Sequence, residues 1–371
     1  MTAQTQGTVS PASTSEPLLS VDSLTVSFPT DDGVVHAVRG VSYELGPGQV
    51  LGIVGESGSG KSVSSMAVMG LLPKTARITG SVRFRGQELI GASDDKMRKI
   101  RGDKVAMVFQ DPMTSLNPVY RVGWQIVEAL QAHNKMSDAQ ARERSIDLLN
   151  IVGIPRPKER IDNYPHEFSG GMRQRVVIAL AMANDPDVII ADEPTTALDV
   201  TVQAQVLEAL HKARAETQAS MVLITHDLGV VAGAADRVLV MYAGKAVEMG
   251  TVDEIYYQPR MPYTLGLLGS LPRLDVGRAE RLTPIKGSPP SLINLPAGCP
   301  FTPRCPMSRE QCETEEPQLR STTSIDHLAA CHFSGELTDA EATDVFQVTA
   351  EDLALPEEFV GDVPAQSGSD T

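Results

Sequence analysis

The chain has few aromatic residues, few cysteines and no long hydrophobic run. Phe, Trp and Tyr make up 4% of its 371 residues, whereas 42% of the residues are hydrophobic, an ordinary share for a globular protein. No apolar stretch approaches the ~20 residues that a membrane-spanning helix needs. The N-terminus lacks the basic start and apolar centre of a signal peptide. We therefore expect a cytoplasmic protein, and exclude fibrous and wholly disordered classes.

Positive charge is also scarce. The chain carries 32 Lys and Arg against 47 Asp and Glu, a net charge of −15. Ten of the acidic residues, and none of the basic ones, lie in residues 332–371. Because nucleic-acid-binding proteins usually carry a basic face, this composition argues against DNA or RNA as a partner. The sequence predicts disordered tails over residues 1–17 and 336–371.

Apolar periodicity predicts strands near the N-terminus and helices in the middle of the chain. Val21–Phe28, Val41–Leu45 and Val50–Val54 have the pattern of strands, and a helix is expected from Lys61. Residues 122–149 have helical spacing, which predicts a helical insertion.

The region from residue 188 predicts a parallel sheet. Val188–Ala191 and Met221–Thr225 have the pattern of buried strands, and Val200–Ala213 and Leu228–Ala235 that of helices. Strands that alternate with helices are typical of an α/β fold with a buried parallel sheet.

A glycine-rich segment follows the strand predicted at Val50–Val54. It matches the phosphate loop G-x-x-x-x-G-K-[ST], in which glycines let backbone amides point at phosphate oxygens. Lys61 is expected to contact the β- and γ-phosphates, and Ser62 to bind Mg²⁺. An ordinary glycine turn is the alternative, which the flanking strand and helix disfavour. The predicted phosphate-binding residues are Gly55, Glu56, Ser57, Gly58, Ser59, Gly60, Lys61 and Ser62.

Two carboxylates follow the strand predicted at Val188–Ala191. They are Asp192 and Glu193, at the edge of a parallel sheet where ligands bind. Asp192 is expected to hold Mg²⁺, directly or through water. Glu193 is expected to orient or deprotonate the water that attacks the phosphate. A solvated acidic loop is the alternative interpretation.

A second helix start with anion-binding character lies at Phe168–Gln174, Phe-Ser-Gly-Gly-Met-Arg-Gln. A hydroxyl and two glycines present backbone donors there, although a plain helix cap has the same composition. One nucleotide rarely needs both helix starts from the same subunit. The sequence therefore predicts a dimer in which each subunit closes the other's site.

These motifs, taken together, resemble the nucleotide-binding subunit of ABC transporters, over about residues 18–270. The resemblance implies a P-loop NTPase domain of the ABC type, with a parallel-sheet core, an antiparallel β subdomain and a helical subdomain at about 112–183. It implies that ATP lies between the phosphate loop of one subunit and the signature of its partner. The motifs that carry it occur in the order phosphate loop, Gln110, Phe168–Gln174, Asp192-Glu193, Ala197-Leu198-Asp199 and His226.

The resemblance also implies roles for single residues. Phe28 would stack on the adenine, and Gln110 would bind Mg²⁺ and relay the presence of the γ-phosphate through Asp111–Pro118 to a membrane partner. His226 would contact the γ-phosphate, as a catalytic residue beside Glu193. Considered alone, the Phe is more often a core residue and the His a structural one.

Further implied roles concern the dimer. Asp199 would lie at the dimer interface, although capping of the following helix is the alternative. The signature residues that would act on the partner's ATP are Ser169, Gly170, Gly171 and Met172.

Two longer segments resemble one branch of the family, the oligopeptide, dipeptide and nickel importers. They are Phe109–Pro118 and Phe168–Arg175, and Met172 is usual in this branch. Arg260–Thr264 is similar to a Pro-Tyr-Thr segment of the same branch, with Met261 where His is common.

All four cysteines lie near the C-terminus, at Cys299, Cys305, Cys312 and Cys331. In a reducing compartment this clustering favours a metal over disulfides, and spacing alone does not separate Zn²⁺ from an iron–sulfur cluster. Residues 299–306 resemble the C-terminal domain of the peptide-importer ATPases, which implies a [4Fe-4S] cluster in a small domain over residues 271–335. Zinc and free thiols are the alternatives.

The resemblance implies an ATPase, a translocase that energises import of di- or oligopeptides from the cytoplasmic face of the membrane. Its partners would be a second, related ATP-binding subunit, two membrane permease subunits and an extracytoplasmic peptide-binding protein. Nickel or another small solute is an alternative cargo.

Two other classes of function stay open. A soluble ABC-type ATPase acting on nucleic acid or ribosomes usually has paired ATPase units or a long coiled coil, and this sequence has neither. A metal-dependent sensor would leave the hydrolytic motifs unexplained.

Overall fold

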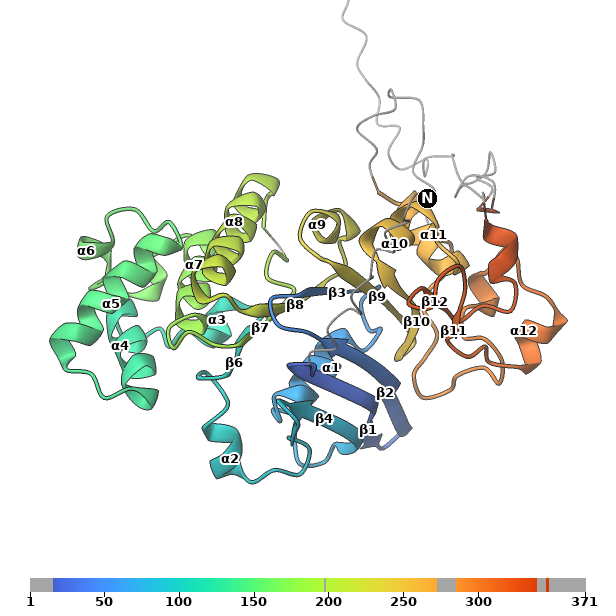
Figure 1. Cartoon of the computed structure of the whole chain (residues 1–371), viewed down its shortest axis with the longest axis horizontal. Helices are drawn as coiled ribbons and strands as arrows, with labels where there is room; N and C mark the ends of the chain where they lie inside the picture. Colours follow the sequence, from blue (N-terminus) through green and yellow to red (C-terminus); the bar gives the residue numbers. More distant parts are fainter. Residues whose placement is uncertain (1–15, 197, 272–284, 339–344, 347–371) are drawn as a thin grey trace, which may run out of the picture.

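The protein is described by a computed structural model that covers residues 16–196, 198–271, 285–338 and 345–346. Its elements form an antiparallel sheet, a larger mixed sheet with helices on it, and a helical lobe. In Figure 1 the helical lobe and the C-terminal segments lie at opposite ends of the larger sheet, and the antiparallel sheet lies below it. Residues 1–15 of the predicted N-terminal tail and most of the predicted acidic tail lie outside these residues.

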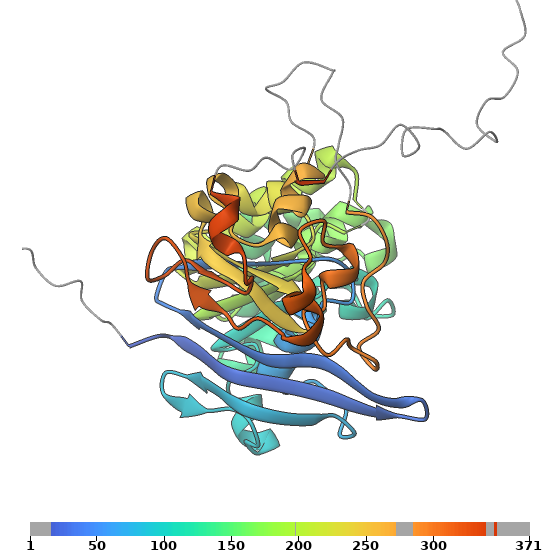
Figure 2. The same cartoon turned by 90° about the vertical axis from the view of Figure 1, so that its right-hand side faces the viewer.

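The antiparallel sheet contains the first two strands of the chain. Its strand order is β2-β1-β4-β5, and β1 pairs with both β2 and β4 along most of its length. Leu19, Leu24 and Val26 of β1 are buried, because this sheet packs one face against the larger one. Figure 2 shows its long hairpin running beneath the larger sheet. The bounds are β1 Leu19–Thr30, β2 Gly33–Leu45, β4 Arg77–Phe84 and β5 Gln87–Glu88.

The larger sheet has eight strands in the order β11-β12-β10-β9-β3-β8-β7-β6. The five strands from β9 to β6 are parallel, and β10, β12 and β11 add antiparallel pairings at one edge. Every residue of β3, β7 and β8 is buried, as expected for parallel strands covered on both faces. The bounds are β3 Val50–Val54, β6 Val105–Val108, β7 Val188–Asp192, β8 Ser220–Thr225, β9 Arg237–Tyr242, β10 Lys245–Thr251, β11 Arg320–Ser321 and β12 Leu328–Ala329.

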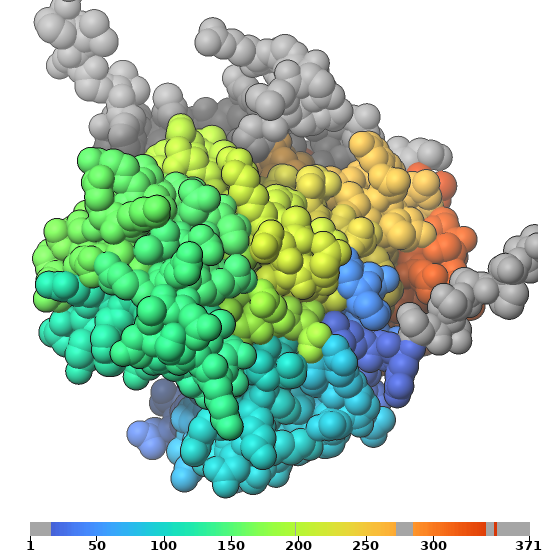
Figure 3. Space-filling model, turned by 60° about the vertical axis from the view of Figure 1, so that its left-hand side comes forward, coloured from blue at the N-terminus to red at the C-terminus, as the bar shows by residue number. Residues whose placement is uncertain are grey.

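The helical lobe is inserted between β6 and β7. It packs around a buried apolar cluster that includes Ile126, Leu130, Leu148 and Leu149. In Figure 3 the helical lobe, in green, lies beside the blue and cyan residues that include the antiparallel sheet. Its elements are α3 Pro112–Ser115, α4 Val122–His133, α5 Asp138–Ile151, α6 Pro157–Arg160, the 3-10 turn Pro165–Glu167 and α7 Gly170–Ala181.

Other helices cover the sheets or follow strands. The longest is α8, which packs against α7 and reaches back toward the start of β8. None of the helices in the described part of the chain is both long and apolar enough to cross a membrane. The bounds are α1 Lys61–Val68, α2 Asp94–Arg98, α8 Val200–Thr217, α9 Leu228–Ala232, α10 Val252–Tyr257, α11 Pro262–Gly269 and α12 Glu310–Thr314.

The segment after α11 contributes to the larger sheet. Strand β12 pairs with β10, where buried Glu248 accepts hydrogen bonds from the backbone N–H groups of Arg260 and Met261. The carboxylate also lies 2.9 Å from Nε2 of buried His327. The cysteine-bearing segment is therefore packed on the nucleotide-binding core, with only short elements of its own.

The fold class predicted from the sequence is confirmed for the parallel core, the antiparallel sheet and the helical insertion. Helix α9 ends at Ala232, earlier than the predicted 235, because Gly233 closes it. The acidic tail also differs at its start. Glu336, its first predicted residue, lies in a 3-10 turn at Ser334–Leu337 and pairs with Arg309.

Candidate nucleotide-binding site

The phosphate loop lies between β3 and α1, with backbone conformations that favour glycine. Gly55 has φ of 151° and Gly60 has φ of 99°; a Cβ atom would lie 2.2 Å from the carbonyl oxygen of Met241 at the first and 2.3 Å from that of Ala37 at the second. Neither position has room for a side chain. The glycines predicted from the pattern are thus required by close backbone packing as well as by conformation.

Lys61 is folded inward over the loop. Its Nζ donates to the carbonyl oxygens of Gly55 at 2.7 Å and Glu56 at 2.9 Å, and its side chain is almost fully buried. Burial lowers the pKa of this ammonium group, and the carboxylates of Glu193 and Asp192 oppose that shift. These two carbonyl contacts hold a cation at the mouth of the loop, as a phosphate-binding lysine requires.

Asp192 is the last residue of β7 and faces the start of α1. The hydroxyl of Ser62 donates to its Oδ1 at 2.9 Å. Burial raises the pKa of Asp192, because the ionised carboxylate loses hydration there. A hydroxyl and a carboxylate at this separation offer two oxygen ligands of the kind that Mg²⁺ prefers.

Glu193 is the point on which the site converges. Its backbone has φ of 45°, in the left-handed region, and its N–H donates to the carbonyl of Ile224 in β8. Strained backbone of this kind is concentrated at functional sites. Its carboxylate contacts four side chains: Lys61 at 3.7 Å, Gln110 at 3.2 Å, Thr196 at 2.8 Å and Nδ1 of His226 at 3.5 Å.

A cleft surrounds these residues. It brings together the predicted phosphate loop, Phe28, Gln110, Glu193 and His226, which come from separate parts of the chain. Phe28 lies in β1, opposite Val35 of β2, and both residues line the cleft. The cleft also has walls that sequence reasoning missed, namely Thr196, Leu267, Ser270 and Leu292. Thr196 follows the acidic pair by three residues, whereas the others carry no local signal.

The predicted signature residues lie apart from this cleft. Ser169 caps α7, its Oγ accepting from the N–H of Met172 at 3.4 Å, and Ser169 and Gly170 are exposed. Asp199 is also exposed and caps α8, its Oδ1 accepting from the N–H of Val202 at 3.0 Å. Neither segment lines the cleft that holds Lys61 of the same chain.

The four cysteines line one small apolar pocket with Phe301 and Phe333. All four are free thiols. Burial raises the pKa of Cys305 to about 12 and that of Cys331 to about 11. Within the described residues, no three His, Cys, Asp or Glu side chains are arranged to hold a metal ion. The geometry thus does not support the predicted [4Fe-4S] cluster, although thiols are the donors that such a cluster uses.

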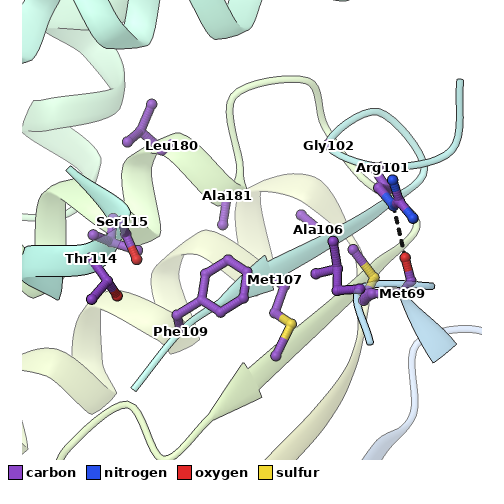
Figure 4. Close-up of a pocket in the computed structure, with 12 residues that line it drawn as sticks. Met69, Arg101, Gly102, Ala106, Met107, Phe109, Thr114, Ser115, Leu180 and Ala181 are labelled. Atoms are coloured by element: carbon purple, nitrogen blue, oxygen red, sulfur yellow. Dashed lines mark hydrogen bonds between the residues drawn. The ribbon is translucent and has the colours of Figure 1, made fainter. Parts of the chain in front are cut away.

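A second, apolar pocket opens between β6, α3 and α7 (Figure 4). Met107 and Phe109 lie at its centre, with Thr114 and Ser115 on one side and Leu180 and Ala181 above them in the view. At the other end, Nε of Arg101 donates to the carbonyl of Met69 at 2.7 Å. Because Phe109 precedes Gln110, this pocket adjoins the segment that enters the nucleotide cleft.

Comparison with protein families gives two matches along the chain. The ABC transporter family matches residues 38–196, and the oligopeptide/dipeptide transporter C-terminal region matches residues 247–312. The second match includes three of the four cysteines.

Two curated relatives are each 55% identical to this chain over the aligned residues. The dipeptide transport ATP-binding protein DppD of Bacillus subtilis is 55% identical over 318 residues, which cover 85% of this chain and 94% of that protein. The oligopeptide transport ATP-binding protein OppD of Mycobacterium tuberculosis is 55% identical over 336 residues, 90% of this chain. The chain spans about half, 55%, of the length of that mycobacterial relative.

Solved structures with the same fold include the dimeric structure of MJ0796, a bacterial ABC transporter cassette. It superposes with a TM-score of 0.57 at 28% identity, over 63% of this chain and 98% of that one. A post-hydrolysis dimer of the same cassette with ADP and Pi gives a TM-score of 0.56 at 27% identity, with 63% and 98% covered.

Proposed function

The chain belongs to the ATP-binding subunits of ABC transporters, in the oligopeptide/dipeptide branch, and we propose that it hydrolyses ATP to energise import of di- or oligopeptides. The observation that carries the ATPase proposal is the convergence on Glu193 of Lys61, Gln110, Thr196 and His226. A cationic, an amide, a hydroxyl and an imidazole side chain around one carboxylate are groups that would contact a γ-phosphate or the water that attacks it.

The chemistry assigned to these residues is phosphoryl transfer to water. The amides of residues 55–62 and Lys61 would hold the β- and γ-phosphates. Ser62, Asp192 and Gln110 would hold Mg²⁺, which when bound offsets phosphate charge. Glu193 would orient the attacking water and take its proton, and Thr196 and His226 fix the direction of its carboxylate.

We assign the signature and Asp199 to a dimer. Ser169, Gly170, Gly171 and Met172 are outside the cleft of their own chain, and the exposed start of α7 presents backbone donors. These features support a second ATP-binding subunit that completes the site. Phe28, which lines the cleft of its own chain, would stack on the adenine. The dimeric structure of MJ0796 is a precedent for such pairing.

We assign the apolar pocket of Figure 4 to the membrane partner. It is lined by Met69, Leu71, Met107 and Phe109, and Leu71 is 40% exposed. Because Gln110 contacts Glu193 on one side and follows Phe109 on the other, a permease segment seated here would sense the state of the nucleotide site. The proposed assembly has two permease subunits and an extracytoplasmic peptide-binding protein, and places this chain on the cytoplasmic face of the membrane.

The ATPase test uses Glu193→Gln. The amide keeps the size of the side chain and leaves the phosphate loop intact, but it does not accept a proton. We expect ATP binding to persist while turnover falls by about 10²–10⁴-fold, measured as released phosphate. Glu208→Gln, on the exposed face of α8, is the matched control and should hydrolyse normally. Near-normal hydrolysis by Glu193→Gln would refute the assignment.

The transport test uses uptake of labelled di- and oligopeptides in cells that lack this chain. Restoration by the normal protein and by Glu208→Gln, but not by Glu193→Gln, would establish ATP-driven peptide import. Equal uptake in all strains, with redundant importers deleted, would point to nickel or another small solute. Failure to co-purify with membranes as well would favour a soluble ABC-type ATPase.

A separate proposal concerns the thiols of Cys299, Cys305, Cys312 and Cys331, as ligands of a [4Fe-4S] cluster. Support comes from the match of residues 247–312 to the oligopeptide/dipeptide C-terminal region, whereas the geometry shows only that the four thiols lie in one pocket. Anaerobic purification should then give about four irons and four sulfides per chain, and Cys312→Ser should lose them. Stoichiometric zinc, or a metal-free protein, would contradict the cluster.

A further inference from the structure

A residue of the cysteine segment contacts the phosphate loop directly. Arg304, which immediately precedes Cys305, forms two parallel hydrogen bonds with the carboxylate of Glu56. Nη1 lies 2.6 Å from Oε2, and Nη2 lies 2.8 Å from Oε1. The side chain of Arg304 is 4% exposed. A bidentate pair of this kind fixes the relative orientation of its two partners.

Arg304 is itself held by residues of the C-terminal region and by Tyr242 of β9. Its Nε donates to the carbonyl of Lys286 at 3.0 Å, and Nη1 also donates to the hydroxyl of Tyr242 at 3.3 Å. The guanidinium lies 5.9 Å from the ring centroids of both Tyr242 and Phe301. Phe301 also lines the cysteine pocket. The position of the guanidinium therefore depends on how the segment around the cysteines is folded.

Glu56 passes this constraint to the nucleotide cleft. Its backbone N–H donates to the hydroxyl of Tyr263 at 2.9 Å, and its carbonyl accepts from Nζ of Lys61 at 2.9 Å. The side chain, the amide and the carbonyl of one loop residue are thus all engaged. A shift of the Glu56 backbone would therefore move the carbonyl that holds Lys61.

The charges of Arg304 and Glu56 give a second reason to expect an effect of this pair on ATP binding. Glu56 places a carboxylate in a loop built to surround phosphates, and two anions at short range in a partly buried site repel each other. Arg304 neutralises it. Removal of one partner of a buried pair leaves an uncompensated charge, which is strongly unfavourable. Here that charge would be negative and would face the incoming triphosphate.

We propose that Arg304 is a positioning residue for ATP: by neutralising and orienting Glu56, it makes the nucleotide affinity of the phosphate loop depend on the folded cysteine segment. The proposal rests on the ATP-binding function proposed above. It assigns to the C-terminal segment a part in the nucleotide site that its sequence position, some 250 residues from the loop, does not suggest.

The experiment is a double-mutant cycle on the dissociation constant of Mg-ATP, measured on the full chain by titration. We expect Arg304→Met to weaken Mg-ATP binding about tenfold or more. Arg304→Lys should weaken it less, because Lys keeps the positive charge and loses only the bidentate geometry. Glu56→Gln with Arg304→Met should recover much of the affinity, since the unpaired carboxylate is gone. Such recovery is a readout that loss of folding alone would not give.

The matched control is Arg309→Met. Arg309 lies in the same segment and makes a similar bidentate pair, but with Glu336 and at the surface. It should bind Mg-ATP like the normal protein. The thermal midpoint of each variant is measured alongside, and if Arg304→Met does not fold, Arg304→Lys and Glu56→Gln complete the cycle.

Three results would overturn the proposal. If Arg304 variants bind Mg-ATP as tightly as the normal protein, the positioning role is wrong, and the proposed ATPase function is unaffected. If the double variant binds Mg-ATP as weakly as Arg304→Met, the proposal is also wrong, because Arg304 would then have only a structural role. A normal protein that binds no Mg-ATP would overturn both this proposal and the proposed function.

Discussion

At the scale of single residues, the site places charges where water is largely excluded. Asp192 is 5% exposed and Lys61 4%, and burial shifts the pKa of each toward its neutral form. Each side chain has partners that oppose the shift: Ser62 donates to Asp192, and the carboxylates of Glu193 and Asp192 favour the charged form of Lys61. Charged side chains that are buried for ligand binding lower the stability of the fold.

Asp192→Asn tests that cost. The pKa of Asp192 is raised, so its ionised form destabilises the fold above that pKa, and the effect is absent below the pKa of the unfolded chain, about 3.9. The variant should therefore be more stable than the normal protein at pH 7 without nucleotide, by about 0.5–2 kcal/mol. The difference in stability between the two proteins should vanish near pH 3.5. The variant should also lose Mg²⁺-dependent hydrolysis. Thermal unfolding of both proteins at the two pH values measures this difference. An unchanged thermal midpoint at pH 7 would contradict the prediction.

At the scale of elements, the packing of α7 on α8 sets the position of the signature. A Cβ atom at Gly171 would lie 2.1 Å from Cγ1 of Val202, whereas one at Gly170 would meet Leu198 at an ordinary 3.8 Å. The glycine at 171 therefore allows the two helices to approach closely. Among the described residues, Gly170 has no neighbour this close, and it is exposed.

Gly171→Ala should separate the two helices. The added methyl overpacks the contact with Val202, and we expect a loss of about 1–3 kcal/mol in the free energy of unfolding. Gly170→Ala is the matched control, with the same change one residue earlier, and it should not destabilise the fold. Denaturant titration of both variants checks this. Equal effects of the two substitutions would show that the helix contact does not depend on Gly171.

At the scale of the whole molecule, the C-terminal segment is joined to the nucleotide-binding core. Strands β12 and β11 extend the larger sheet, and buried Glu248 links β10 to His327 and to the backbone before α11. A partly buried network adds Arg39 and Lys245, which both pair with Glu316. The sheet is continuous from the helical lobe to the cysteine segment.

Glu248→Ala should loosen this junction. It leaves two backbone N–H groups and the buried His327 ring without their acceptor, and removal of one partner of a buried pair costs about 3–5 kcal/mol. We expect a lower thermal midpoint and faster proteolysis after residue 285. Glu336→Ala, which removes an exposed partner of Arg309 in the same region, should leave the midpoint unchanged. A stable Glu248→Ala protein would show that other contacts hold the segment.

The sequence by itself determined the parts of this protein that depend on neighbouring residues. Strand β3 begins and ends where the apolar pattern predicted, α1 starts at Lys61, and the phosphate loop lies between them. Local spacing sufficed because the glycine loop, its lysine and its helix are contiguous. The strand end at Asp192-Glu193 was equally local, so the position of these two carboxylates after a buried strand could be predicted without a fold.

Only the tertiary structure decided what lies across from these motifs. Thr196 accompanies Glu193, Leu292 forms a wall of the cleft, and Arg304 holds Glu56, a pairing between positions 248 residues apart. No periodicity or spacing encodes such a pair, because it depends on how β10, β12 and the cysteine segment pack on the core. Short-range pattern thus fixed the chemistry of the phosphate site, and long-range packing set its walls and its link to the C-terminal segment.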